Sequence, residues 1–333
     1  LVSGVIVDQT KKTKPWIVTG YFLAGVGRPL ILLANSWLWV VAIRFTDRLG
    51  KGLRSTPRDA LLADLVPANR RGLTFGLHRS MDNAGGVIGP LLAALLLALD
   101  VPLKDIFLWA IVPAVITVVL ALFIKEPVKA VDTSEYRFKW SLAGLSPTFR
   151  RYLVVVGLFA LGNSSDMFLL LRARELGVSQ ANIPLLWAAV SLVTTVFGTP
   201  LSALSDTFGR KHFILIAWLA FAGFYFAMAL PGISLWGLFV LFGVYGLFRA
   251  ATEGVEKALV ADLAPLGLTG TAFGWFNLVA GVMLLPASLI FGWLYEAVGS
   301  SYAFLFSGSC AMLAFLLMAF WVNPKSTAQT QPL

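Results

Sequence analysis

Apolar stretches of about 20 residues recur along the whole chain, separated by short polar breaks. A helix of about 20 residues crosses the roughly 30 Å hydrocarbon core of a bilayer, whereas strands of a membrane barrel alternate in polarity over about ten residues. Hydrophobic residues make up 58% of the chain and charged residues 13%. The pattern therefore predicts an all-α polytopic membrane protein, because a soluble domain rarely carries so many apolar residues.

Ten membrane spans are predicted from these stretches. They cover residues 15–34, 36–63, 72–98, 104–124, 150–175, 183–204, 212–230, 234–262, 270–295 and 301–322. The loops on one side of these spans are rich in lysine and arginine, and the opposite loops carry Lys104. Since basic loops stay in the cytoplasm, that side and the C-terminus are predicted to be cytoplasmic, in a bacterial inner membrane. The net charge of +9 is then a topology signal, and no nucleic-acid partner is expected.

A segment of the first half is repeated in the second half. The sequence ALLADLVP at residues 60–67 shares six of eight positions with ALVADLAP at residues 258–265, at an offset of 198. The same offset relates Asp8 to Asp206, and the Phe-Gly pair at 75–76 to that at 273–274. One register across such distant motifs indicates an internal duplication, which is typical of transporters built from two repeated helical bundles.

The loop motif around each of these aspartates resembles the loop signature of the major facilitator superfamily. The second copy matches it at Ser202, Asp206, Gly209, Arg210 and Lys211. The first copy keeps Gly4, Asp8, Lys12 and Lys14, but has Lys11 in place of a glycine and Thr13 in place of a basic residue.

This resemblance implies a fold of two pseudo-symmetric helical halves with about ten of twelve transmembrane helices present. By comparison with the second half, the first span of the family pattern and most of its second are expected to be missing from this sequence. The expected division is an N-terminal half at residues 1–128, a cytoplasmic central loop at 129–148 and a C-terminal half at 149–333.

A basic stripe is predicted on the second of the ten spans. At about 100° per residue, one face of this helix carries Arg44, Arg48, Lys51, Ser55 and Arg58. Contact with lipid would cost roughly 2.5–3.5 kcal/mol for each central basic residue, so the stripe must face protein or water. Two interpretations are open: the deeper Arg44, Asp47 and Arg48 contact substrate or protons, or the stripe is a structural charge network that includes Arg54, Arg58 and Asp59.

The resemblance also implies a cytoplasmic gate. In this family the loop aspartate pairs with a basic residue of the neighbouring fourth span and with the start of the eleventh span. Here Asp8 is the matching acid, with Arg54 or Arg58 as its expected basic partner, and Asp206 serves the second half.

The next span contains a glycine and proline pattern at Gly76, Gly85, Gly89 and Pro90. It resembles the fifth-span signature of facilitator antiporters, with Ala93 and Ala94 in place of the final glycines. The glycines permit close helix packing and the proline introduces a bend. A packing seam without influence on transport direction is the open alternative.

The same span carries His78, Arg79 and Asp82. Their i,i+4 and i,i+3 spacings place His78 and Arg79 within reach of Asp82. Ionisable groups inside a membrane are functional candidates, and histidine exchanges protons near neutral pH. A static pair between Arg79 and Asp82 is the alternative.

Two polar segments interrupt the spans of the second half. The first contains Asn163, Ser164 and Asp166, and the second contains Arg249, Glu253, Glu256 and Lys257. Arg249 and Glu253 are four residues apart, so an ion pair within the helix is the alternative to a role in transport. Asp166 has no basic residue nearby in the sequence, so Asp166 and Glu253 are the preferred proton or substrate contacts, beside Asn163 and Arg249.

The sequence contains no phosphate-binding loop, metal-ligand cluster or nucleophile triad. We therefore expect no enzymatic activity, cofactor or metal site. The predicted function is secondary active transport of a small molecule by a monomer that alternates access across the lipid bilayer. Proton-coupled export of a small organic solute is preferred, and the basic stripe favours an anionic one. A proton-coupled importer, a transporter-like sensor that does not transport, and a lipid flippase are the alternatives.

Overall fold

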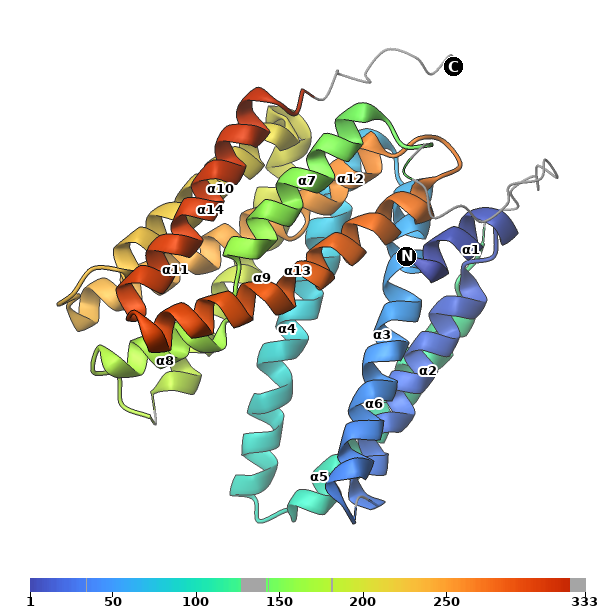
Figure 1. The fold of residues 1–333 in the computed structure, drawn as a ribbon. Coiled ribbons are helices and arrows are strands. Elements are labelled where there is room, and N and C mark those ends of the chain that lie inside the picture. The colour runs from blue at the N-terminus through green and yellow to red at the C-terminus, as the bar shows by residue number, and fades with distance from the viewer. Residues whose placement is uncertain (34, 127–141, 143, 181, 324–333) are drawn as a thin grey trace. The chain divides into compact units, whose positions relative to one another are not determined.

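The computed structural model describes residues 1–33, 35–126, 142, 144–180 and 182–323, and the regular structure of these residues is entirely helical (Figure 1). The predicted central loop at 129–148 lies largely outside the described residues. The elements, in chain order, are α1 (Val2–Thr10), α2 (Lys14–Leu30), η1 (Ile31–Leu33), α3 (Trp37–Leu65), η2 (Ala68–Arg70), α4 (Arg71–Ala98), α5 (Leu103–Trp109), α6 (Ile111–Leu122), α7 (Pro147–Gly162), α8 (Met167–Glu175), α9 (Ile183–Phe208), α10 (Arg210–Met228), α11 (Leu235–Thr252), α12 (Val255–Leu263), α13 (Thr269–Ala297) and α14 (Ser300–Phe320).

Among the described residues, eight helical segments are long and apolar enough to cross a membrane. They run over residues 68–98, 104–122, 147–175, 183–208, 210–228, 235–263, 269–297 and 300–320, close to eight of the ten predicted spans. The other two predicted spans are also helical, as α2 and α3. The helix α2 is only 17 residues long, and α3 carries the basic stripe that lowers its mean hydropathy.

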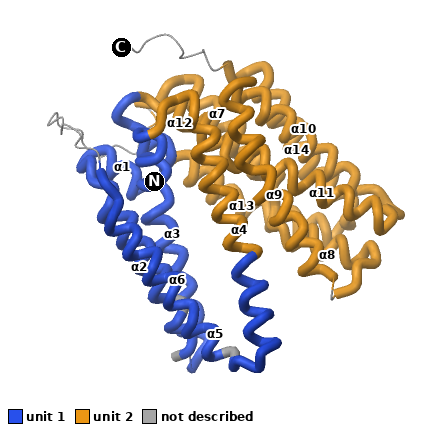
Figure 2. The backbone as a smooth tube through the Cα atoms, turned by 180° about the vertical axis from the view of Figure 1, so that it is seen from behind, with its two compact units in different colours: residues 1–65, 88–141, 266–274 blue, residues 66–87, 142–265, 275–333 orange. Residues whose placement is uncertain are grey.

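The chain divides into two compact units (Figure 2). The first unit contains Leu1–Leu65, Ile88–Ser141 and Leu266–Gly274, and the second contains Val66–Val87, Leu142–Pro265 and Trp275–Leu333. The first unit therefore includes a short segment from late in the chain, Leu266–Gly274, and the second includes one from early in the chain, Val66–Val87. The predicted halves at 1–128 and 149–333 remain a prediction.

The first unit is built around α2, which packs against α3 and α6. Ile17, Leu61 and Ala121 form its small buried core. A Cβ added to Gly20 would lie 2.6 Å from the carbonyl oxygen of Gly50. Glycine at these positions therefore allows the backbones of α2 and α3 to approach closely.

The second unit has a larger, aromatic core. The rings of Phe159 and Trp218 stack with centroids 4.4 Å apart, and those of Phe221 and Tyr225 with centroids 4.3 Å apart. Trp218, Phe221 and Tyr225 have 0% exposed surface. Because aromatic side chains bury large areas in fixed orientations, this cluster holds α7 and α10 rigidly beside the cavity described below.

One glycine of the predicted packing seam lies in a close contact between helices. A Cβ on Gly76 would lie 2.8 Å from the Ser202 hydroxyl, so α4 and α9 depend on glycine for their close contact. A Cβ on Gly85 or Gly89 would meet no atom within 4 Å. Among the described residues, the close contacts of this face end near Ser80, which meets Gly198, and close packing at Gly85 and Gly89 stays a prediction. Pro90 lies inside α4, which continues as a helix to Ala98.

Candidate functional site

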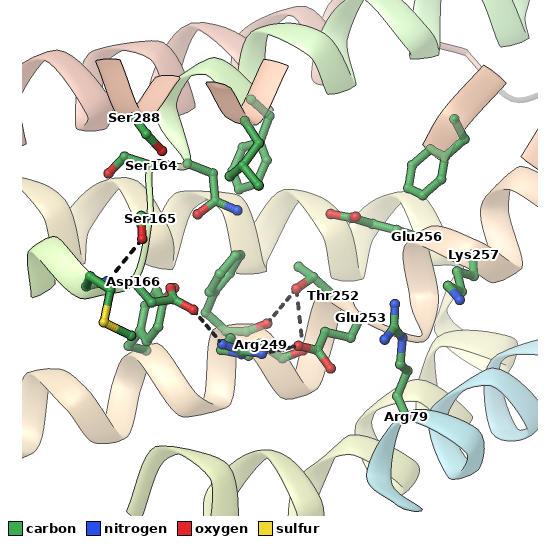
Figure 3. Close-up of a pocket in the computed structure, with 17 residues that line it drawn as sticks. Arg79, Ser164, Ser165, Asp166, Arg249, Thr252, Glu253, Glu256, Lys257 and Ser288 are labelled. Atoms are coloured by element: carbon green, nitrogen blue, oxygen red, sulfur yellow. Dashed lines mark hydrogen bonds and ion pairs between the residues drawn. The ribbon is translucent and has the colours of Figure 1, made fainter. Parts of the chain in front are cut away.

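A cavity of about 600 Å³ lies within the second unit (Figure 3). Its walls come from α4, α7, α8, α11, α12, α13 and the turns between them. The charged residues of its lining are Arg79, Asp166, Arg249, Glu253, Glu256 and Lys257. Aromatic and hydroxyl side chains fill the remaining wall, among them Phe159, Phe276 and Ser288. Such a mixture of apolar wall and few polar groups is typical of small-molecule sites.

Two interrupted helices supply most of this lining. The helix α7 ends at Gly162, and α8 begins at Met167 after the irregular segment 163–166. The helix α11 ends at Thr252, and α12 begins at Val255 after a two-residue turn. Glycine, asparagine, serine and aspartate are poor helix formers, which explains both breaks. Irregular backbone is tolerated at membrane depth where it lines a cavity, and transporters bind solutes at such breaks.

Arg249 joins the two breaks through ion pairs. Its Nη1 lies 3.1 Å from Asp166 Oδ2, and its Nη2 lies 2.7 Å from Glu253 Oε1. The Tyr245 hydroxyl donates to Asp166 Oδ1 at 2.6 Å, and Asn83 Nδ2 donates to Glu253 Oε2 at 2.9 Å. Both carboxylates therefore have charged and neutral donors, as buried charges require.

The pairing of Arg249 with Glu253 confirms the predicted i,i+4 contact. For Asp166 the structure corrects the sequence argument, which found no basic partner nearby in the chain. Arg249 is 83 residues away in sequence and becomes that partner through the packing of the second unit.

The predicted cluster on α4 is present as a set of longer contacts. Asp82 Oδ2 lies 3.7 Å from both His78 Nδ1 and Arg79 Nη1. Of these three residues, Arg79 is part of the cavity lining. Asp82 is 49% exposed, so its ion pairs contribute little to stability.

Glu256 differs from the other carboxylates of the cavity. Trp218 Nε1 donates a hydrogen bond of 3.0 Å to Glu256 Oε1. No lysine, arginine or histidine of the described residues lies within 4.0 Å of its carboxylate. The sequence does not distinguish Glu256 from its charged neighbours, because its isolation depends on which acids Arg249 contacts.

The second-unit aspartate of the loop motif caps a helix. Asp206 accepts hydrogen bonds from the backbone amides of Gly72 at 2.8 Å and Leu73 at 2.9 Å, which open α4. A carboxylate is favoured there because the first amides of a helix lack partners and carry partial positive charge. Arg210 pairs with Asp206 at 3.0 Å and also contacts Asp262, which Arg71 binds at 2.9 Å.

Gly209 and Lys211 complete this loop. Gly209 has a φ of 91°, a left-handed conformation that favours glycine between α9 and α10. Lys211 Nζ donates to the Ala319 carbonyl at 2.8 Å and to Asn323 Oδ1 at 3.1 Å, so it anchors the end of α14.

The first-unit aspartate makes the equivalent contact. Asp8 accepts hydrogen bonds from the amides of Gly270 at 2.8 Å and Thr271 at 2.6 Å, at the start of α13. The contact predicted between Asp8 and the start of the eleventh span of the family pattern is therefore present, with α13 as that span. Gly4 lies against Gly270 and Thr56, leaving no room for a side chain.

Arg54 and Arg58, the two arginines expected near Asp8, contact other residues of the first unit. Arg54 donates to the Gly20 carbonyl at 3.3 Å and lies over the Tyr21 ring, and Arg58 pairs with the fully buried Asp59 at 3.2 Å. These contacts link α3 to α2 and neutralise a buried acid, in agreement with the structural interpretation of the lower stripe.

The upper part of the stripe lies on α3 in the first unit. Arg44 and Arg48 are exposed and Asp47 is half-buried. Their role in substrate or proton contact stays a prediction.

The chain matches the family model of the Major Facilitator Superfamily over residues 1–173 and again over 152–333. A protein of Methanocaldococcus jannaschii described as an uncharacterized MFS-type transporter is 32% identical over 332 residues, which cover 96% of this chain and 81% of that protein. The multidrug resistance protein MdtH of Proteus mirabilis is 28% identical over 307 residues, covering 89% and 74%.

A solved structure shares the fold at much lower sequence identity. The crystal structure of the human organic anion transporter MFSD10 aligns with a TM-score of 0.79 at 16% identity, over 95% of this chain and 79% of that one. Together with the repeated family match, this likeness accounts for the helical architecture and the apolar spans. The chain is an integral membrane protein that belongs to the major facilitator superfamily of transporters.

Proposed function

We propose that this protein is a secondary active transporter that exports a small organic solute in exchange for protons. The observation that carries the proposal is the cavity of about 600 Å³, in which two interrupted helices present paired charges. Maintaining six ionisable side chains within apolar spans is expensive, so their presence favours a role in binding or coupling. In such a transporter the two helical halves rock around a central site, and the solute and the coupling ion bind there in turn.

Export is favoured by the similarity to a protein named for multidrug resistance. The pattern of Gly76, Gly85, Gly89 and Pro90 supports the same direction through its resemblance to an antiporter signature. We further propose that the C-terminus is cytoplasmic, that the protein resides in a bacterial inner membrane and that it works as a monomer.

Asp166, Arg249 and Glu253 are proposed to contact solute or protons, with Asn163 beside them. Their three charges meet where both helices break, so a solute that displaces one ion pair changes the contacts of both helices. The basic residues Arg44 and Arg48, with Asp47, favour an anionic or zwitterionic solute. His78, Arg79 and Asp82 form a second candidate proton pathway on α4.

Asp8 and Asp206 are proposed to hold the cytoplasmic gate. Each caps a helix within its own unit through backbone amides, so opening of the gate would require these caps to break and form again. Substitution of these residues should change turnover more than solute selectivity.

Alternating accessibility tests this proposal. Ser288→Cys places a thiol in the cavity, after Cys310→Ala has removed the native cysteine. A membrane-impermeant maleimide should label this thiol in both right-side-out and inside-out vesicles, with a ratio that shifts between pH 6 and pH 8. Lys104→Cys, at the end of a span and on the side that is predicted to be extracytoplasmic, should react from one side at both pH values. Labelling of Ser288→Cys from a single side under every condition would support a sensor.

A further inference from the structure

Glu256 lines the cavity, and no basic side chain among the described residues forms an ion pair with its carboxylate. Arg249 lies within 3.1 Å of Asp166 and Glu253, and Arg79 lies 3.7 Å from Asp82. Glu256 instead accepts the indole N–H of Trp218 at 3.0 Å. Its second oxygen has no hydrogen-bond donor among the described residues. An ionised carboxylate in such a place is costly, unless a proton or a cation neutralises it.

We propose that Glu256 is the exchange site of the cavity, where a proton and a cationic group of the solute bind in turn. This inference rests on the proposed proton-coupled transport and deepens it by naming the residue and the solute chemistry. The solute carries a cationic group that binds at Glu256; a zwitterion with an ammonium group meets this requirement and also the preference for an anionic group proposed for Arg44 and Arg48.

The exchange is a simple displacement. As the cationic group approaches, the O–H bond of the Glu256 carboxylic acid breaks and the proton passes to water in the cavity. The carboxylate then forms an ion pair with the solute. The reverse step restores the acid and releases the cation, so each transfer conserves charge at the site and one proton counters one solute charge.

The surroundings of Glu256 suit a cationic group. Phe159 and Phe276 line the same cavity, and the indole of Trp218 contacts the carboxylate directly. Aromatic faces attract organic cations by about 0.5–2 kcal/mol, so a carboxylate with aromatic walls binds them from two sides. The remaining oxygen of Glu256 is the acceptor that such a cation needs.

Other charges around the site set the balance of the exchange. Arg79 on α4 is close enough to attract the Glu256 carboxylate, and Glu253 in the turn before α12 repels it. Lys257 on α12 adds a buried positive charge beside it in sequence, and the Tyr152 hydroxyl on α7 is the neighbouring titratable group. In Figure 3 the Arg79 side chain extends from α4 toward the turn that carries Glu253. Arg79 is thus shared among several acids, which leaves Glu256 open to exchange.

The cavity contains two kinds of carboxylate. Asp166 and Glu253 hold Arg249 and so fix the two breaks relative to each other. Protonating either of them would disrupt this framework. Glu256 can change its charge while the Arg249 pairs remain intact, which makes it the better site for a reversible step.

Tetraphenylphosphonium, a permanent organic cation, is a suitable probe. Its binding to the purified protein should release protons, measured with an indicator dye in weakly buffered detergent solution. On the acid side of the titration its affinity should fall about tenfold for each unit of pH, since one proton competes with one cation. Glu256→Gln should abolish both proton release and pH dependence, whereas Glu256→Asp should retain them. Glu296→Gln, on an exposed glutamate of α13, serves as the matched control and should behave as wild type.

Trp218 provides a readout that does not depend on transport. Its contact with Glu256 should produce a pH-dependent ultraviolet difference spectrum that disappears in both Trp218→Phe and Glu256→Gln and remains in Glu296→Gln. Loss of this signal with retained folding supports the assignment of the titrating group. Unchanged proton release in Glu256→Gln would overturn it, and proton uptake on salicylate binding without any response to the cation would overturn the solute class. If the Trp218 signal and the proton release are present but vesicles show no solute flux, the proposed function fails while the exchange site stands.

Discussion

Asp8 and Asp206 make the same contact at two places in the molecule. Each carboxylate accepts hydrogen bonds from two consecutive amides at the start of a helix: Asp8 from Gly270 and Thr271, and Asp206 from Gly72 and Leu73. The offset of 198 residues that relates the two aspartates also relates the two pairs of amides. The internal duplication therefore preserves a crossed arrangement, in which each loop caps a helix from the other half of the sequence.

The side chains around the two caps differ, so substituting the two aspartates should lower the free energy of unfolding by different amounts. Asp206 is 5% exposed and pairs with Arg210, whereas the Asp8 carboxylate is supported by the Thr271 side chain and by the charge of Lys11. Asp206→Asn should cost about 3 kcal/mol because it breaks a buried ion pair, and Asp8→Asn about 1 kcal/mol as a lost cap. Thermal unfolding of the detergent-solubilised variants measures both. Equal losses would show that Arg210 adds nothing to the second-unit cap.

Arg249 should be the most sensitive residue of the cavity framework. Arg249→Gln removes the ion-pair partner of both Asp166 and Glu253, and breaking a buried pair in this way costs about 3–5 kcal/mol. The melting temperature should fall, and adding Glu253→Gln should recover part of the loss. Arg174→Gln, on an exposed arginine of α8, is the control and should have little effect. A small effect of Arg249→Gln with no recovery in the double variant would contradict the ion-pair framework.

The glycines of α4 should respond in opposite ways to alanine. Gly76→Ala places a methyl group 2.8 Å from the Ser202 hydroxyl, and overpacking of this kind costs about 1–3 kcal/mol. Gly85→Ala and Gly89→Ala meet open space and should be neutral or stabilise the helix by up to about 1 kcal/mol. The yield of folded protein and its melting temperature distinguish the two outcomes. Destabilisation by Gly85→Ala would support the longer packing seam that the sequence predicted.

The contacts of Glu126 should make the free energy of unfolding depend on pH. Burial acts to raise the pKa of its carboxyl group, but hydrogen bonds from Thr13 and Lys14 and the Lys14 charge outweigh burial, so this pKa is lowered from 4.5. A lowered folded-state pKa gives stability that is present above the unfolded-state value and is lost as the pH falls through the folded-state value. Wild type should therefore be more stable than Glu126→Gln above pH 4.5, and the difference should vanish on further acidification. Thr13→Val removes one donor and should keep part of the effect, and a constant difference at all pH values would exclude this explanation.

Local patterns in the sequence were sufficient for the architecture and for contacts within one helix. The apolar spans located the membrane helices, and the i,i+4 spacing identified the pair of Arg249 and Glu253. The contact between Asp166 and Arg249 depends on how α11 packs beside the break after α7, so no local pattern contains it. The isolation of Glu256 could be recognised only after the partners of every neighbouring charge were known. The glycine pattern of α4 is not sufficient for the same reason, since glycine spacing alone does not show where a packing partner ends.

Proton movement driven by a solute is the direct measure of coupled transport by this protein. The protein is reconstituted in liposomes that contain a pH-sensitive dye, and anionic, zwitterionic and cationic compounds are added in turn. The account predicts proton flux that is triggered by at least one compound, accompanied by solute flux in the opposite direction and lost in Glu256→Gln but kept in Glu296→Gln. Solute binding without flux of either solute or protons would contradict the transporter assignment, and solute flux without proton movement would contradict the coupling.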